Sequence, residues 1–277
     1  MELFYEGSDG SIINFMKHPL YAQNPESLCA SSWGYSTISG VNGLGRVKRF
    51  FKNTQETSLK ISVMTDNAEE FNAVMYDMHR TFDRDVRRLQ PGKLWWNGFY
   101  KEVFAVDISH EEFEELFESV EKTVRFISVY PYWIRKTTYT YGTAVVGPEG
   151  LDYDDFDFGF DYDADDTIEV VQNNCIGKAN FELCFYGPCQ NPSVVIGDHT
   201  YEMLVDLSSG EHCTVNSLTK KIMKYSAYGV AENVFHLRGR DSYIFEQIPE
   251  GDVPIIRNGQ VTVDVTIFDE RGEPEWI

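Results

Sequence analysis

The sequence has 277 residues, of which 42% are hydrophobic and 25% are charged, and its 44 Asp and Glu outnumber its 24 Lys and Arg. A chain of this length is expected to form about two domains, each large enough to bury its own core. The net charge of −20 repels phosphate groups, so neither nucleic acid nor an anionic membrane is an expected partner.

The N-terminus and the cysteine content indicate a reducing compartment. The chain begins without the basic start and long apolar run of a signal peptide. The five Cys are an odd number, which fits free thiols better than a disulfide framework. No apolar stretch approaches the length needed to cross a bilayer. We therefore expect synthesis in a cytoplasm and a soluble product.

Short strands are predicted at the start of the chain. Leu3–Tyr5 and Ser11–Phe15 read as two strands around the turn formed by residues 7–10. Residues 16–45 are rich in Pro and Gly, which predicts an irregular, extended segment. Phe50 to Met64 has β-type content and ends in alternating apolar and polar residues.

A long helix follows. Asp66 or Asn67 can cap its N-terminus, and Pro91-Gly92 ends it. Apolar residues recur at three- and four-residue steps and form one face. These residues are Phe71, Val74, Met75, Met78, Phe82, Val86 and Leu89.

The first domain is predicted to end with further strands. Lys93–Trp96 and Tyr100–Ile108 form a hairpin about Asn97-Gly98, a strong turn signal. Residues 110–120 are acidic with apolar residues at helical spacing, which indicates a short helix or a strand insertion. Val124–Tyr130 is a further strand, and residues 1–136 are assigned to this domain.

The second half, residues 137–277, is predicted to be an all-β sandwich because short apolar runs alternate with turns and no helical pattern is present. The predicted strands are Thr167–Val171, Asn180–Tyr186, Ser193–Ile196, Glu202–Val205, Lys221–Tyr225, Tyr243–Gln247 and Val261–Phe268. Between the domains, residues 151–166 alternate acidic and aromatic side chains. The fold class is thus mainly β with one or two helices.

The acidic and aromatic junction partly resembles a calcium loop. Asp161, Asp163 and Asp165 give the start of an EF-hand loop, but Asp166 replaces the turn glycine and Gln172 replaces the bidentate Glu. An arm whose aromatic residues pack on a sheet while its acids face water explains the alternation better.

Other candidate sites are weaker. Gly40 to Gly45 lacks the spacing and context of a phosphate loop and is interpreted as a glycine turn. Zinc binding by cysteines is not favoured, because Cys184 and Cys189 are spaced more widely than the tight pairs of zinc ribbons and Cys184 lies within a predicted strand. The cysteines considered are Cys175, Cys184, Cys189 and Cys213. The six His are dispersed and form no catalytic motif. No catalytic, cofactor-binding or metal-binding residue is therefore assigned.

Two small basic groups remain to be explained, because Lys and Arg clusters are what nucleic-acid binding requires. One lies at the predicted helix end, where the helix dipole favours positive charge; the other lies just before Phe50. They consist of Arg84, Arg87 and Arg88, and of Arg46, Lys48 and Arg49. We expect no binding to duplex DNA from either group.

Several stretches together resemble one protein family. Asp154–Asp163 is similar to the aromatic and acidic junction of distal tail proteins of long-tailed phages. Ala179–Leu183 followed by Tyr186–Pro192 resembles a strand and the Gly-Pro-x-x-Asn-Pro turn in the second domain of that family. The hairpin at Leu94–Gly98 and the preceding helix are similar in layout.

The resemblance implies a structural role without enzymatic activity or cofactor. It implies a ring-forming first domain and a galectin-like sandwich as the second. It further implies a homo-hexameric hub at the virion tail tip, made in the bacterial host cytoplasm. This hub joins the tail tube protein to the tail-tip lysin, the baseplate or the receptor-binding proteins.

Two alternatives from other functional classes stay open. A carbohydrate-binding adhesion module would need an exposed aromatic residue in a groove of the second domain, for which Tyr201 and Trp276 are candidates. A polysaccharide hydrolase would need two carboxylates that converge in a cleft. A sandwich fold does not by itself imply sugar binding, because function lies in sites and not in folds.

Overall fold

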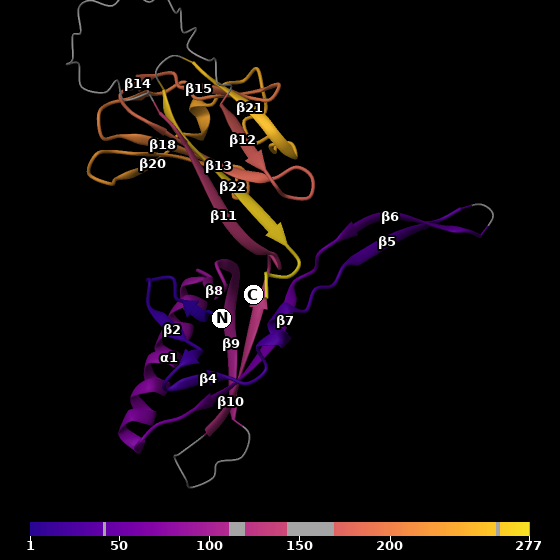
Figure 1. The fold of residues 1–277 in the computed structure, drawn as a ribbon, viewed down its shortest axis with the longest axis vertical. Coiled ribbons are helices and arrows are strands. Elements are labelled where there is room, and N and C mark those ends of the chain that lie inside the picture. The colour runs from indigo at the N-terminus through magenta and orange to yellow at the C-terminus, as the bar shows by residue number, and fades with distance from the viewer. Residues whose placement is uncertain (41–42, 111–119, 143–168, 259–260, 277) are drawn as a thin grey trace, which may run out of the picture. The chain divides into compact units, whose positions relative to one another are not determined.

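The computed structural model describes residues 1–40, 43–110, 120–142, 169–258 and 261–276 (Figure 1). These residues form a mainly β structure, as predicted, with one α-helix among the described elements. The chain divides into two compact units, Met1–Arg135 with Glu270–Ile277, and Lys136–Asp269. The C-terminal segment therefore groups with the first unit, whereas the sequence assigned it to the second domain.

In the first unit, the strand order is β9-β10-β7-β4-β3, and β8 pairs with β9 while β1 pairs with both β8 and β2. All these pairings are antiparallel. The strands are β1 (Leu3–Glu6), β2 (Ile12–Asn14), β3 (Met16–Lys17), β4 (Leu20–Ala22), β7 (Gln55–Val63), β8 (Gly92–Trp96), β9 (Phe99–His110) and β10 (Val120–Ser128).

Helix α1 (Ala68–Arg88) begins and ends near the predicted residues. The Asn67 side chain accepts a hydrogen bond from the Glu70 backbone N–H at 2.9 Å, so it caps the first turn. Leu89 adopts the left-handed conformation (φ 53°) and closes the C-terminus. Leu89 is 82% exposed, so its assignment to the apolar face was wrong because the chain leaves the helix there. The buried apolar face comprises Phe71, Met78 and Phe82.

The hairpin β8–β9 confirms the predicted turn. Asn97 (φ 44°) and Gly98 (φ 82°) both have positive φ, as a type I′ turn requires. Trp96 pairs with Phe99 directly across it. Both side chains are fully buried, so the turn fixes the register that carries two large aromatic residues into the core.

Residues 16–45 are more regular than predicted. They contain β3, β4, the 3₁₀ helix η1 (Pro25–Cys29) and β5 (Gly34–Ser39). Strand β5 pairs with β6 (Gly45–Phe51), and these two strands form a sheet of their own. Strands β5 and β6 were not predicted. Both of their faces are largely exposed, so the sequence lacks the regular alternation of apolar and polar residues that marks a half-buried strand. The predicted helix at residues 110–120 falls mostly outside the described residues.

The second unit is a two-sheet sandwich, as predicted. One sheet has the order β20-β19-β18-β13-β22-β11 and the other β12-β21-β15-β16, with β14–β17 as a small extra pair. The strands are β11 (Trp133–Tyr141), β12 (Val170–Asn173), β13 (Asn180–Tyr186), β14 (Cys189–Gln190), β15 (Ser193–Ile196), β16 (His199–Glu202), β17 (Asp206–Leu207), β18 (His212–Asn216), β19 (Lys221–Tyr225), β20 (Ala231–Asn233), β21 (Gly251–Arg257) and β22 (Thr262–Arg271).

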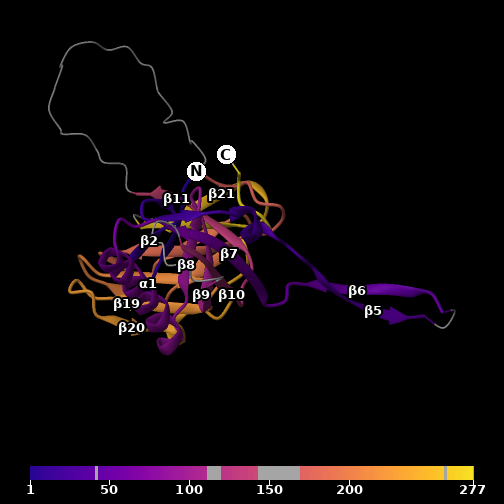
Figure 2. The same ribbon diagram turned by 90° about the horizontal axis from the view of Figure 1, so that it is seen from below.

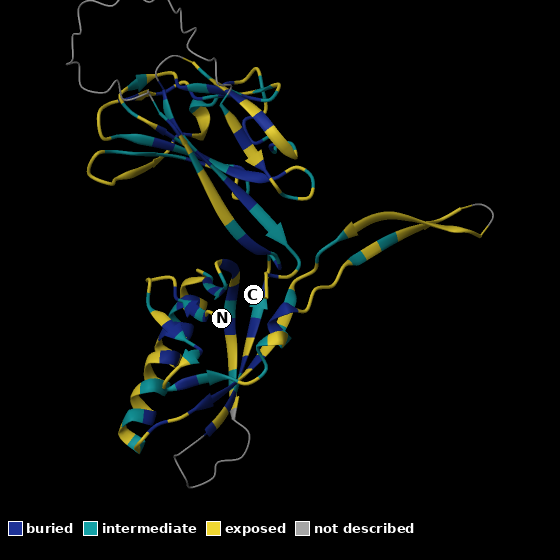
Figure 3. Cartoon of the chain, in the orientation of Figure 1, coloured by how far each residue is buried: buried dark blue, intermediate teal, exposed yellow. Residues whose placement is uncertain are grey.

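Alternation along the strands builds the core of this unit, as the burial colours show (Figure 3). On β13, Phe181, Leu183 and Phe185 are fully buried, and on the opposite sheet Val194 and Ile196 of β15 are equally buried. All belong to one hydrophobic cluster. The two inner faces thus meet as a sandwich requires. The only helix among residues 169–258 and 261–269 is the 3₁₀ turn η2 (Phe235–Leu237).

Two predicted strands of this half were wrong. Residues 243–247 form turns, in which the Glu246 N–H donates to the Tyr243 carbonyl at 2.9 Å. The strand predicted at 202–205 ends instead at Glu202. The acidic and aromatic stretch at 151–166, with Asp161, Asp163 and Asp165 of the calcium hypothesis, lies outside the described residues.

No helix in the described part of the chain is long and apolar enough to cross a membrane.

Candidate assembly surfaces

The described cysteines and histidines do not converge. No group of three or more His, Cys, Asp or Glu side chains among the described residues is placed to hold a metal ion. All five cysteines are free. Burial raises the pKa of Cys29 to about 11 and that of Cys213 to about 12. Both are therefore protonated, unreactive thiols in their cores.

Neither aromatic residue proposed for sugar stacking is suited to it. Tyr201 is fully buried, its hydroxyl donates to the Glu246 carbonyl at 2.7 Å, and its ring meets Phe181 edge-on. Trp276 groups with the first unit, where it packs edge-on against Trp96. Core packing uses the ring of Tyr201, whereas Trp276 is 50% exposed but groups with the first unit, so neither one offers a free ring on the second unit.

A row of rings lies instead on one sheet of the second unit. Tyr186 on β13, His212 on β18 and Tyr225 on β19 are consecutive cross-strand neighbours. His212 stacks on Tyr225 with ring centres 4.7 Å apart and planes 10° apart. Since these two rings stack on each other across neighbouring strands, the row stabilises strand pairing.

Lys101 on β9 is the most perturbed basic residue of the first unit. Its side chain is 2% exposed, and its ammonium lies 3.3 Å from the Leu28 carbonyl and 4.6 Å from the Trp133 ring centre. Burial lowers the pKa of Lys101 to about 8. Because the partners are a backbone carbonyl, the Gln55 amide and a ring, the ammonium ties η1 to the sheet and has no reacting partner.

Replacing Lys101 with Met is expected to change how the stability of the first unit depends on pH. The ammonium is lost near pH 8 in the folded state and near 10.5 in the unfolded state. Between these pH values the unfolded state binds more protons than the folded state. The free energy of unfolding of the wild type therefore rises with pH, whereas that of Lys101→Met lacks this rise. Urea unfolding at a series of pH values measures this difference, with surface Lys17→Met as control. A difference that does not change with pH would contradict the assignment.

A buried carboxylate holds the N-terminal strand to the helix. Asp85 of α1 is fully buried and accepts hydrogen bonds from the Tyr5 hydroxyl at 2.6 Å, the Ser8 backbone N–H at 3.0 Å and the Ser8 hydroxyl at 2.5 Å. Burial and the neighbouring Asp85 raise the pKa of Tyr5 above its ordinary range. The three donors satisfy the carboxylate, so this network is structural.

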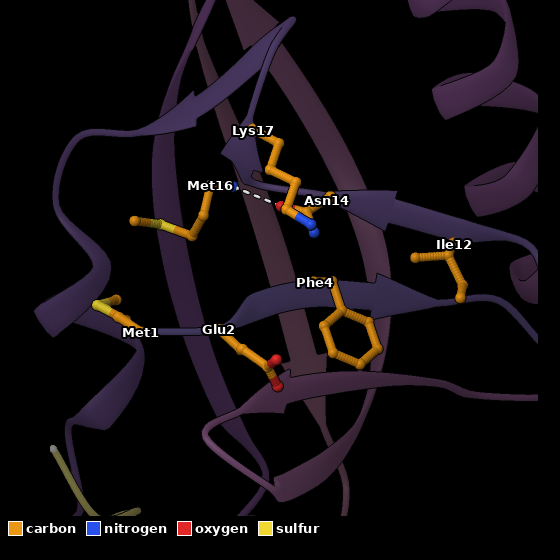
Figure 4. A pocket seen from close by; sticks show the side chains of 7 residues that line it. All are labelled: Met1, Glu2, Phe4, Ile12, Asn14, Met16 and Lys17. Atoms are coloured by element: carbon orange, nitrogen blue, oxygen red, sulfur yellow. Dashed lines mark hydrogen bonds between the residues drawn. The ribbon is translucent and has the colours of Figure 1, made fainter.

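A shallow hollow of about 280 Å³ lies beside β1, β2 and β3 (Figure 4). Its lining residues are Met1, Glu2, Phe4, Ile12, Asn14, Met16 and Lys17. Glu2 is the one carboxylate side chain among them, whereas glycoside hydrolysis needs two. Ile12 on the edge strand β2 is 66% exposed. The hollow suits an apolar side chain of a partner better than a catalytic reaction.

A second hollow, of about 270 Å³, lies between the first turn and α1 and does contain two carboxylates, Asp9 and Asp77. Asp9 is engaged by the Arg84 guanidinium and accepts hydrogen bonds from the Ser11 backbone and hydroxyl. A general acid must be free to exchange its proton with substrate. The engaged Asp9 therefore does not support a hydrolase.

The pair β5–β6 of the first unit, here called the arm (Gly34–Ser39 and Gly45–Phe51), exposes several large apolar side chains. Figures 1 and 2 show it apart from the other strands of that unit. Tyr35, Phe50 and Leu44, between 62% and 79% exposed, lie on it or in its connecting turn. Contiguous exposed apolar surface often marks an interaction site, and aromatic residues are enriched at interfaces.

The base of the arm is held in place. Trp33 meets Tyr132 edge-on with ring centres 6.5 Å apart. The Lys52 ammonium lies 4.9 Å from the Trp33 ring centre and 5.3 Å from that of Tyr132. Burial lowers the pKa of Lys52. The Gln55 amide also donates to the Ala30 carbonyl. The arm therefore leaves the body of the unit from an ordered base.

No family model and no curated protein matches the chain at the level of sequence. Solved structures match it over nearly its whole length. The crystal structure of the Dit protein of phage SPP1, described as a paradigm of the hub adsorption apparatus in phages that infect Gram-positive bacteria, aligns with a TM-score of 0.62 and 11% identity, covering 97% of this chain and 98% of that one.

Two structures of the phage P2 baseplate in its activated conformation match equally well. The one with Ca aligns with a TM-score of 0.60 and 13% identity, over 96% of this chain and 98% of that chain. The one with Sr aligns with a TM-score of 0.61 and 12% identity, over 96% of this chain and 97% of that chain. The chain thus has the fold of phage Dit hub and baseplate proteins, which confirms at the level of fold the resemblance seen in the sequence.

Proposed function

We propose that this chain is a structural protein of a phage-type tail tip, a distal tail protein, and that it is not an enzyme. The observation that carries the proposal is the match to the SPP1 Dit hub protein, which spans both units and leaves only a few per cent of either chain unmatched. An agreement of this extent supports a shared architecture of two units in the same order. The hollows described above, which lack a free carboxylate pair, support a structural role.

The proposed assembly is a closed ring of six copies. The first unit forms the ring and the second unit is a galectin-like sandwich. Rings follow from a head-to-tail contact between two different patches when the rotation closes. The first unit offers unlike patches of this kind, namely the arm and the apolar hollow beside the edge strand β2.

The ring would join the tail tube protein to baseplate, tail-tip lysin or receptor-binding proteins. Its place would be the virion tail tip, after synthesis in the host cytoplasm. The net charge of −20 suits a ring past which DNA moves, because an acidic surface neutralises few phosphates and does not retain the duplex.

Self-assembly of the purified full-length chain tests this proposal. We expect a concentration-dependent species of six copies by native mass spectrometry, and closed rings with a central opening by negative-stain electron microscopy. A chain that stays monomeric at the highest attainable concentration, or that forms open filaments, would contradict the ring.

A further inference from the structure

We infer that the second unit carries a docking surface for a short acidic segment of a partner protein. The surface lies where the turn between β18 and β19 meets the loop that follows η2. It is here called the basic patch and consists of Lys220, Phe235, Arg238 and Tyr243, with Lys221 and Arg240 beside them in the sequence. The inference goes beyond the proposed function, because it gives the second unit a binding surface that does not depend on the ring.

The charge of this part of the chain is opposite to that of the unit around it. The second unit, residues 136–269, contains eight Lys and Arg and 22 Asp and Glu, a net charge of −14. Five of the eight basic residues lie between residues 217 and 245, where only Glu232 and Asp241 are acidic. An acidic unit that gathers most of its basic residues in one stretch favours an acidic partner at that place.

The cations of the basic patch have no ion-pair partner among the described residues, unlike other basic residues of the unit. Lys178 meets Glu246 at 2.6 Å, and Lys224 meets Glu211 at 3.0 Å. The residues without such a pair are Lys220, Lys221, Arg238 and Arg240. The hydrogen bond from Lys178 lowers the pKa of Glu246, and Lys220 adds a smaller electrostatic effect, so this carboxylate is already engaged. The charges of the patch are therefore available to carboxylates from outside.

Aromatic rings lie directly beside two of these cations. The Lys220 ammonium lies 5.6 Å from the ring centre of Tyr243 and 5.2 Å from that of Phe245. The Arg238 guanidinium lies 4.1 Å from the ring centre of Phe235, which stacks on Phe245 with ring centres 6.1 Å apart. Phe245 is buried, whereas Phe235 and Tyr243 are 39% and 57% exposed. The patch thus combines exposed aromatic rings with Arg, and both are enriched at protein interfaces.

Hydrogen bonds hold the loop that carries Arg238 and Tyr243. The Gly239 N–H donates to the Glu202 carbonyl at 2.9 Å. The Nε2 atom of His199 lies 2.9 Å from the Tyr243 carbonyl oxygen. Both contacts tie the loop to strand β16, so a partner meets a surface that is already ordered and binding costs little further backbone entropy.

The charge around the basic patch favours a short acidic polypeptide over a long polyanion. A nucleic acid or an anionic polysaccharide carries negative charge along its whole length, so it extends beyond the patch onto a unit with a net charge of −14. A segment of a folded protein places a few carboxylates opposite the cations and need not extend further. Because salt screens charges beyond about 8 Å under physiological conditions, the local cations decide this contact although the whole chain is acidic.

Fluorescence anisotropy with the full-length chain tests the inference. The probe is a short fluorescein-labelled peptide of alternating Glu and Tyr, and the same peptide with Gln in place of Glu is the uncharged control. Lys220→Asn with Arg238→Gln is expected to weaken binding of the Glu–Tyr peptide at least about tenfold. Asn is chosen because Lys220 has a positive φ of 56°, which Asn tolerates. Lys17→Asn with Arg88→Gln is the charge-matched control, because both residues are exposed in the first unit, and it is expected to bind like wild type.

The aromatic part of the patch has its own pair of variants. Tyr243→Ser is expected to weaken binding about fivefold. Tyr228→Ser is the control, because this residue of the second unit is 95% exposed in the connection between β19 and β20. Circular dichroism checks that each variant folds. If the variant of Lys220 and Arg238 fails to fold, Lys221→Gln with Arg240→Gln supplies the result, since both side chains are exposed, and about a threefold loss of affinity is expected.

The outcomes separate the inference from the proposed function. If the Glu–Tyr peptide does not bind wild type, or binds the patch variants as tightly as wild type, the inference is overturned, while ring formation judges the proposed function separately. If oligodeoxythymidylate or oligogalacturonate of the same length binds wild type more tightly than the peptide and loses affinity in the patch variant, the patch serves a nucleic acid or an anionic saccharide. That result also overturns the inference.

Discussion

Replacing Asp85 with Ala is expected to destabilise the first unit by at least about 3 kcal/mol. The fully buried carboxylate accepts hydrogen bonds from the Tyr5 hydroxyl and from both the backbone and the hydroxyl of Ser8. Its removal leaves the buried Tyr5 hydroxyl without an acceptor, releases the two donors of the exposed Ser8 and opens a small cavity. Asp85→Asn keeps one acceptor oxygen, so its stability is expected to lie between those of Asp85→Ala and the wild type.

Urea unfolding followed by tryptophan fluorescence measures this effect selectively. The five tryptophans, Trp33, Trp95, Trp96, Trp133 and Trp276, all belong to the first unit. Asp83→Ala on the same helix is the control, because that carboxylate is exposed and meets Arg87 only at 3.8 Å. We expect it to change stability by less than about 0.5 kcal/mol. Equal effects of the two substitutions would show that the Asp85 network does not hold the N-terminal strand.

Replacing Ile255 with Ala is expected to destabilise the second unit by about 3 kcal/mol. Ile255 on β21 is 3% exposed, pairs with Ile196 of β15 and belongs to the hydrophobic core of the sandwich. The substitution removes three carbon atoms from a closely packed interior, so both the transfer free energy and the contacts around the new cavity are lost.

The neighbouring residue supplies a control of the same type. Ile256 is 65% exposed on the opposite face of the strand, and Ile256→Ala is expected to cost less than about 1 kcal/mol. Circular dichroism during urea unfolding measures both variants, and tryptophan fluorescence identifies the part of the transition that belongs to the first unit. If Ile256→Ala lowered the free energy of unfolding as much as Ile255→Ala does, the assignment of Ile255 to the inner face would be contradicted.

Elements with one buried face were predictable from the sequence. Phe71, Met78 and Phe82 recur at helical spacing, and Asn67 and Leu89 lie at the ends of the helix they define. Asn97-Gly98 favours a turn with positive φ at both residues, and this dipeptide predicted the β8–β9 hairpin. Strand β13 was predicted to the residue because Phe181, Leu183 and Phe185 alternate with less buried neighbours.

The candidate surfaces were harder to predict. Both faces of the arm are exposed, so its sequence lacks the periodic apolar residues that mark an element with one buried face. Its glycines also favoured the prediction of a loop. The absence of acids between residues 27 and 55 was the signal available in the sequence. Tyr201 was misjudged for the converse reason, because sequence does not report which aromatic residues the core covers.

The sequence by itself determined the mainly β class, the single described helix, the sandwich of the second half and the likeness to phage distal tail proteins. These properties depend on local periodicity, turn chemistry and short motifs, which neighbouring residues set. Only the tertiary structure decided that residues 270–277 group with the first unit, that Asp85 meets Tyr5 and Ser8, and that the arm separates Tyr35 and Phe50 from Arg46 and Arg49. These depend on contacts between residues distant in the chain and on strand register, which the packing of the whole unit fixes.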